Sequence, residues 1–147
     1  MKTLVAFVTK GGETGKYAGL IADILKKNGL DVGVVDLKKQ RPDVKQHKNV
    51  IVGGGIKIQR IYGEFSDFLD RNDFKNKRIA FFISSLEPES DAKKKYAEPL
   101  LASNPSLKPV SIGVLSGRMK LLWKTIDKTN LETAKKWAEE LASKLKH

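Results

Sequence analysis

The chain has 147 residues, of which 40% are hydrophobic, and is therefore long enough to form a domain with a buried core. No apolar run reaches the roughly 18 residues of a membrane-spanning helix, and the first residues do not resemble a secretion signal. There are no cysteines, which excludes disulfides, thiolate metal sites and iron–sulfur clusters, so we expect a cytoplasmic protein. The net charge of +11 indicates an anionic partner.

Apolar runs and helical periodicities alternate along the chain. In order, the patterns predict a strand over residues 4–8, a helix over 17–27, strands over 32–37 and 49–53, a helix over 62–70, a strand over 78–85, a helix over 91–102 and a strand over 110–115. A last helix should open at the capping box Thr129-x-x-Glu132 and bury Leu131, Ala134, Ala138, Leu141 and Leu145. Without internal repeats or linkers, residues 1–147 are predicted to form one doubly wound α/β domain with a parallel sheet.

Ligands of open parallel sheets bind at the carboxyl ends of the strands. Residues 9–15, 53–60 and 84–89 leave strands at that edge. The first of these segments lies in the stretch VTKGGETGKYAGL, residues 8–20, which resembles an ATP-binding loop at Gly15-Lys16. However, Lys10 stands where that pattern has its first glycine, and Tyr17 where it has a magnesium-binding hydroxyl. We therefore expect this loop not to bind ATP.

We expect the first loop, residues 9–15, to bind the phosphate of a ligand other than ATP. Thr9 and Thr14 offer hydroxyl donors, and the glycines between and after them let backbone N–H groups approach an anion at a helix N-terminus. The alternative is a turn eased by glycines in which Thr14 only caps the helix.

Thr9-Lys10-Gly11-Gly12-Glu13-Thr14 resembles the flavodoxin motif [ST]-x-T-G-x-T for the phosphate of flavin mononucleotide (FMN), with Gly11 replacing a hydroxyl residue. The match is closer to the branch that contains the flavodoxin-like protoporphyrinogen dehydrogenases. That branch also has a Gly-Ala-Ser-Ile-Arg-Tyr-Gly segment after its third strand, to which residues 53–58 (GGGIKI) are similar. Ile58 stands where the branch has tyrosine, and the chain is shorter near the fifth strand.

The resemblance implies a flavodoxin-like three-layer sandwich with strand order 2-1-3-4-5 and FMN as cofactor. It places the FMN phosphate in the first loop and the ring between the second and third loops. The alternative for the second loop is a flexible strand exit without a ligand, and for the third loop it is a capped loop without a ligand. The cofactor-binding residues that it implies are Thr9, Lys10, Gly11, Gly12, Glu13, Thr14, Gly15, Gly54, Gly55, Ile56, Lys57, Ile58, Ser84, Ser85 and Leu86.

Residues 117–128 (GRMKLLWKTIDK) form a basic segment in which Met119, Leu122, Trp123 and Ile126 fall at helical spacing. Such an amphipathic stretch can contact a membrane surface or an acidic partner, so Arg118–Lys128 is a candidate for peripheral membrane contact. The alternative is that its apolar side chains pack on the sheet.

Three functions remain open from the sequence. The first is an FMN electron carrier that meets an acidic or membrane-associated redox partner. The second is an FMN-dependent oxidoreductase that acts on a quinone or a porphyrinogen, and the third is a flavin-free scaffold. The two histidines and the aspartates show no metal-binding spacing. The sequence has no recognisable nucleic-acid-binding motif and only its positive charge would favour nucleic acid, which is therefore an unlikely partner.

Overall fold

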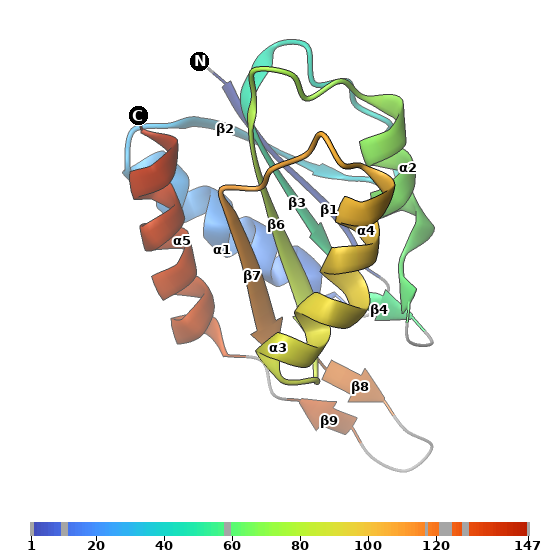
Figure 1. The fold of residues 1–147 in the computed structure, drawn as a ribbon. Coiled ribbons are helices and arrows are strands. Elements are labelled where there is room, and N and C mark those ends of the chain that lie inside the picture. Colours follow the sequence, from blue (N-terminus) through green and yellow to red (C-terminus); the bar gives the residue numbers. More distant parts are fainter. Residues whose placement is uncertain are drawn as a thin grey trace.

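The computed structural model describes residues 2–9, 12–57, 60–116, 118–120, 125–127 and 130–146. Its centre is a five-stranded parallel sheet with the order β2-β1-β3-β6-β7 (Figure 1). The strands are β1 (Lys2–Val8), β2 (Asp31–Asp36), β3 (His47–Gly54), β6 (Arg78–Ser85) and β7 (Ser111–Ser116). Numbered along the chain, this is the order 2-1-3-4-5, which confirms the predicted doubly wound fold.

Helices cover both faces of the sheet. α1 (Glu13–Lys27) and α5 (Leu131–Leu145) lie side by side on one face (Figure 1). α2 (Gly63–Arg71), α3 (Glu89–Ala92), a π-helical turn (Lys93–Ala97) and α4 (Glu98–Ser103) cover the other face. The result is the expected three-layer sandwich.

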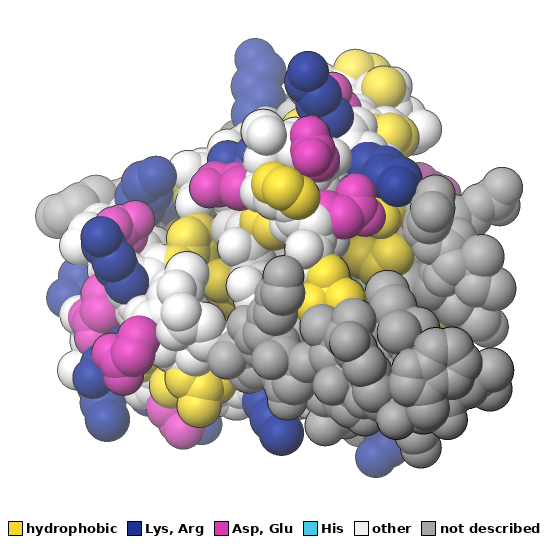
Figure 2. Space-filling view, turned by 90° about the horizontal axis from the view of Figure 1, so that it is seen from below, with side chains coloured by type: hydrophobic (Ala, Val, Ile, Leu, Met, Phe, Trp, Pro, Cys, Tyr) yellow, Lys and Arg dark blue, Asp and Glu magenta, His cyan; other side chains and the backbone are white. Residues whose placement is uncertain are grey.

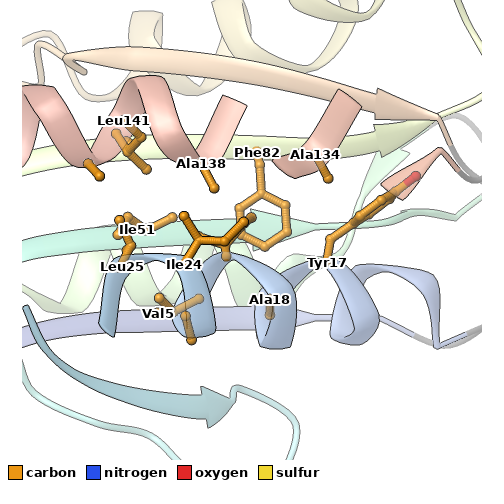
Figure 3. Packing of buried hydrophobic residues seen from close by; sticks show 14 of the residues in the cluster. Val5, Tyr17, Ala18, Ile24, Leu25, Ile51, Phe82, Ala134, Ala138 and Leu141 are labelled. Carbon is orange, nitrogen blue, oxygen red and sulfur yellow. The ribbon is translucent and has the colours of Figure 1, made fainter. Parts of the chain in front are cut away.

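The strands are apolar on both sides because each face meets a helical layer. Successive side chains of a strand point to opposite faces, so Val5, Ile51 and Phe82 pack under α1 and α5 (Figure 3). Their neighbours Leu4, Val52 and Phe81 pack on the α2 side. All six side chains are buried.

Two helix predictions need correction. The helix expected over residues 91–102 is divided by the π-helical turn, which comes just before Pro99. Proline has no N–H for the carbonyl four residues earlier, so the α-helical ladder cannot run through this point unbroken. The last helix is capped by Asn130, whose Oδ1 accepts hydrogen bonds from the backbone N–H groups of Glu132 and Thr133, and not by a box beginning at Thr129.

In α5, Ala134, Ala138, Leu141 and Leu145 are buried as predicted, whereas Leu131 is 50% exposed. Leu131 is the first residue of the helix. Helical periodicity predicts which residues lie on the same face of a helix, but not how much of that face is buried against the rest of the protein.

Two short antiparallel pairs extend from the carboxyl edge of the sheet. One is β4 (Ile56–Lys57) with β5 (Arg60–Ile61), and the other is β8 (Arg118–Lys120) with β9 (Thr125–Asp127) (Figure 1). The helical interpretation of residues 117–128 is therefore wrong at 118–120 and 125–127, while Leu122 and Trp123 lie outside the described residues. None of the helices in the described part of the chain has the length and apolar character needed to cross a membrane.

Candidate functional site

The candidate site lies where β1, β3 and β6 end beside one another. Val8 pairs with Gly54, and Gly54 pairs with Ile83, so the three predicted loops leave neighbouring strands at one edge of the sheet. α1 begins at the same edge, which directs the N-terminal end of its dipole toward the loops. Thus the fold brings together segments that are far apart in the sequence.

The first loop presents an open helix N-terminus. Gly12 caps α1 in the left-handed conformation, with φ of 93° and ψ of −15°, and no side-chain hydrogen bond caps this end. The Gly12 N–H donates to Thr9 Oγ1 at 3.2 Å. A Cβ atom built on Gly12 meets nothing within 4 Å, so the space beside the cap is free of described side chains. This geometry fits an anionic group; Lys10 and Gly11 lie outside the described residues.

Thr14 connects the first loop to the third. Its hydroxyl donates to Ser84 Oγ at 3.1 Å, and both side chains are buried. Gly55, which directly follows β3, lies against the first loop: a Cβ on Gly55 would be 3.2 Å from Thr14 Oγ1 and 3.7 Å from Thr9 Oγ1. The structure therefore gathers Thr9, Thr14, Gly55 and Ser84 in one place.

The three glycines of the second loop have different surroundings. A Cβ on Gly53 would fall 1.9 Å from Phe82 Cζ, and one on Gly54 would fall 2.7 Å from Phe65 Cδ2. Both positions thus need glycine for packing of the core, and only Gly55 faces the threonines of the first loop. The Gly55 N–H donates to Val8 O at 3.0 Å, which holds the Gly54–Gly55 peptide against the end of β1.

The third loop begins inside β6. Ser84 and Ser85 are the last residues of that strand and are buried, while Leu86 is half-buried. Ser85 Oγ accepts a hydrogen bond from the Glu87 N–H at 3.0 Å, which turns the chain away from the sheet. Glu87 in turn accepts a hydrogen bond from the Tyr96 hydroxyl. Burial, together with this carboxylate, raises the pKa of Tyr96.

Tyr62 is a site residue that the predicted set omits. Its Cε2 atom would lie 3.6 Å from a Cβ on Gly55, and Lys38 Nζ lies 4.8 Å from the centre of its ring. Burial, followed by the charge of Glu64, raises the pKa of Tyr62, so the side chain is neutral at physiological pH. The sequence feature that could have identified Tyr62 is its position just before α2, a few residues after the second loop.

The remaining predicted residues are only partly described. Glu13 and Gly15 lie in the first turn of α1, where Glu13 is buried. Ile56 is half-buried and packs near Ile83. The backbone of Lys57 lies in β4, but its side chain and all of Ile58 are outside the described part.

Charge around this edge is mixed. Figure 2 views the molecule from the carboxyl ends of the strands and shows basic and acidic side chains of the described residues interspersed, with apolar patches between them. The large positive net charge is therefore not gathered into one basic patch among the described side chains of this face. Among the described residues, no cluster of histidine and carboxylate side chains is suited to holding a metal ion.

Known proteins resemble this chain over nearly its full length. A family model described as a flavodoxin domain matches residues 4–145. Protoporphyrinogen IX dehydrogenase [quinone] of Escherichia coli (strain K12) is 24% identical over 128 residues, which cover 82% of this chain and 70% of that protein.

Solved structures share the fold at lower identity. Oxidised flavodoxin 1 from Bacillus cereus superposes with a TM-score of 0.70 at 19% identity, covering 100% of this chain and 99% of that one. The flavodiiron core Flv1 from Synechocystis sp. PCC6803 gives 0.74 at 14% identity, covering 99% of this chain and 36% of that one. The strand order and the family match over residues 4–145 lead to one conclusion: the chain belongs to the flavodoxin domain family.

Proposed function

We propose that this protein binds FMN at the carboxyl edge of its sheet and acts as an electron carrier. One observation carries the proposal: the uncapped N-terminus of α1 at Gly12 meets Thr9, Thr14, Gly55 and Ser84 from three different loops. Backbone donors, hydroxyl groups and a position without a side chain are what a phosphate-bearing planar cofactor requires.

Each loop has its own part in binding. The hydroxyls of Thr9 and Thr14 and the N–H groups of the first turn of α1 hold the phosphate, with Lys10 and Gly11 completing the loop. Gly55 leaves space beside these hydroxyls, and Tyr62 supplies an aromatic wall. Ser84, Ser85 and Leu86 face the cofactor from the third loop. Bound FMN supplies the ability to accept and pass on one or two electrons.

The redox partner is proposed to be an acidic protein or a quinone. The net charge of +11 favours association with an anionic surface and accelerates it at low ionic strength. Arg118–Lys128 remains a candidate for contact with that partner or with a membrane surface, because its sequence carries four basic residues, Arg118, Lys120, Lys124 and Lys128.

A second candidate function is a quinone-linked oxidoreductase. The 24% identity to the Escherichia coli dehydrogenase supports this alternative. An enzyme and a carrier differ in whether the protein itself turns over a substrate. A steady-state assay with protoporphyrinogen and menaquinone separates them: turnover favours the enzyme, whereas its absence together with reversible reduction of bound FMN favours the carrier.

Titration of the flavin-free protein with FMN tests the proposal. Binding with one FMN per chain is expected, and ATP under the same conditions should not bind. Failure to bind FMN would leave the flavin-free scaffold as the remaining function.

A further inference from the structure

A groove of about 500 Å³ opens at the amino edge of the sheet, where the strands begin. One wall is the connection between α2 and β6, residues 72–77, and the other is the connection between α4 and β7, residues 104–108. Both connections lie away from β4 and the β8–β9 pair (Figure 1). The lining residues are all outside the three loops of the candidate site, and the volume is within the range of ligand pockets.

The two walls of the groove are fixed by the same device. Asn72 Nδ2 donates a hydrogen bond to Phe68 O at 2.9 Å, and Asn104 Nδ2 donates one to Leu100 O at 2.9 Å. These asparagines follow α2 and α4 directly and satisfy carbonyl groups at the ends of both helices. One backbone hydrogen bond also closes a turn in each connection. The groove is therefore formed before any ligand arrives, which lowers the entropic cost of binding.

The polar lining of the groove is predominantly basic. Lys75, Lys77 and Lys108 line it, and Asp73 is the one carboxylate among the lining residues. Lys77 Nζ donates to the neutral carbonyl of His47 at 2.8 Å, while Lys75 and Lys108 are exposed. The ion pairs among the described residues involve carboxylates outside this groove. The groove thus carries positive charge that the described carboxylates do not neutralise by pairing.

The floor of the groove is apolar and narrows the choice of ligand. It is made by Leu69, Phe74, Ile79 and Leu107, of which Leu107 is half-buried. Phe74 is only 9% exposed, so its ring offers little face for stacking a nucleic-acid base. Lipid headgroups on a flat membrane would meet the lysines but would not use a recessed apolar floor. A protein segment that carries both carboxylates and an apolar side chain uses the lysines and the floor together.

We propose that this groove is a docking site for an acidic segment of a partner protein, with carboxylates at Lys75, Lys77 and Lys108 and one apolar side chain on the floor. The eight residues of β6, at about 3.3 Å per residue, separate the groove from the third loop by about 20–25 Å. A partner seated here leaves the carboxyl edge of the sheet accessible. The groove therefore tethers the protein without covering the candidate site, and the proposal does not depend on FMN.

A short acidic peptide tests the docking site in the full chain. The probe is acetylated and amidated Glu-Asp-Leu-Glu-Asp, titrated into the isotope-labelled protein and followed by NMR. We expect saturable shift changes in residues 72–77 and 104–108 that exceed those in residues 84–89 at the candidate site. The uncharged peptide Gln-Asn-Leu-Gln-Asn should bind at least about tenfold more weakly, and Glu-Asp-Ser-Glu-Asp, which lacks the apolar side chain, at least about threefold more weakly.

Charge reversal in the protein distinguishes the groove from the net charge. Lys75→Glu/Lys108→Glu should weaken binding of the acidic peptide at least about tenfold. Lys94→Glu/Lys135→Glu is the matched control, because both lysines are exposed, lie outside the groove and change the net charge equally. This control should weaken binding about threefold or less, since solvent and salt screen distant exposed charges.

Several results would overturn the docking site. They are shift changes that map to the candidate site, equal weakening by the two double variants, and equal affinity for the charged and uncharged peptides. Equal affinity for the leucine and serine peptides would overturn the role of the apolar floor. Absence of saturable peptide binding would also overturn the proposal, and sedimentation with phosphatidylglycerol vesicles that is lost in Lys75→Glu/Lys108→Glu would assign the lysines to a membrane surface instead.

Discussion

The hydroxyl of Thr14 donates a hydrogen bond to the hydroxyl of Ser84 across 3.1 Å, linking the start of α1 to the end of β6. Both side chains are buried, so neither oxygen can replace the lost partner with bulk water. Thr14→Val and Ser84→Ala should each lower the free energy of unfolding by about 1 kcal/mol. Urea unfolding of both single variants and the double variant gives the coupling energy. A coupling energy of zero would show that the bond does not contribute.

A side chain at Gly12 should lower stability, although space is available for one. Its φ of 93° lies in the left-handed region, where an L-residue costs about 1–2 kcal/mol. We therefore expect Gly12→Ala to destabilise the protein by about that amount in thermal or urea unfolding.

Gly19→Ala is the control for Gly12→Ala. Gly19 lies inside α1, and a Cβ there also meets nothing within 4 Å. Alanine favours the helix over glycine by up to about 1 kcal/mol, so this variant should be more stable than the wild type. If both substitutions shift stability in the same direction, the left-handed cap is not the cause.

Gly55→Val should interfere with ligand binding more than with folding. The first added carbon already lies 3.2 Å from Thr14 Oγ1, and the valine methyl groups extend further among the loops. The FMN dissociation constant should rise at least tenfold. Gly63→Ala, where a Cβ meets nothing within 4 Å, should leave it unchanged. Wild-type affinity in Gly55→Val would remove Gly55 from the site.

His47 should make stability fall in mildly acidic solution. Burial, followed by the charge of Lys2, lowers its pKa below 6.5, so the unfolded chain binds this proton more readily than the folded protein. The stabilisation is therefore present above about pH 6.5 and is lost as the pH falls through the lowered pKa. His47→Gln should lose less stability than the wild type between pH 7.5 and about 5.5 in urea unfolding. If His47→Gln and the wild type lose equal stability, the titration of His47 is not linked to folding.

The alternation of apolar runs was enough to predict the sheet and its strand positions to within a few residues. Parallel strands buried on both faces leave a strong signal, as in residues 78–85, where predicted and observed bounds agree. The strand pair at 118–120 and 125–127 was not predictable, because strands of three residues are too short to show a period of two. The helical spacing misled the prediction at Met119 and Ile126, which lie in these strands.

The site was predictable in part for a similar reason. Thr9, Thr14, Gly55 and Ser84 follow strands whose carboxyl ends must meet once the sheet is parallel, and the structure brings them together. The roles of Gly53 and Gly54 were not predictable, because they depend on phenylalanines contributed by β6 and α2. The Tyr17 hydroxyl accepts a hydrogen bond from the Asn130 N–H, 113 positions away, and such a distant contact leaves no local signal in the sequence.

Fluorescence titration of FMN with the flavin-free protein is the direct test of cofactor binding, because flavin emission reports whether the cofactor is bound. We expect saturable quenching at one FMN per chain, weakened in Gly55→Val and unaffected by excess ATP. No saturable FMN binding, or displacement of FMN by ATP at similar concentrations, would contradict this expectation.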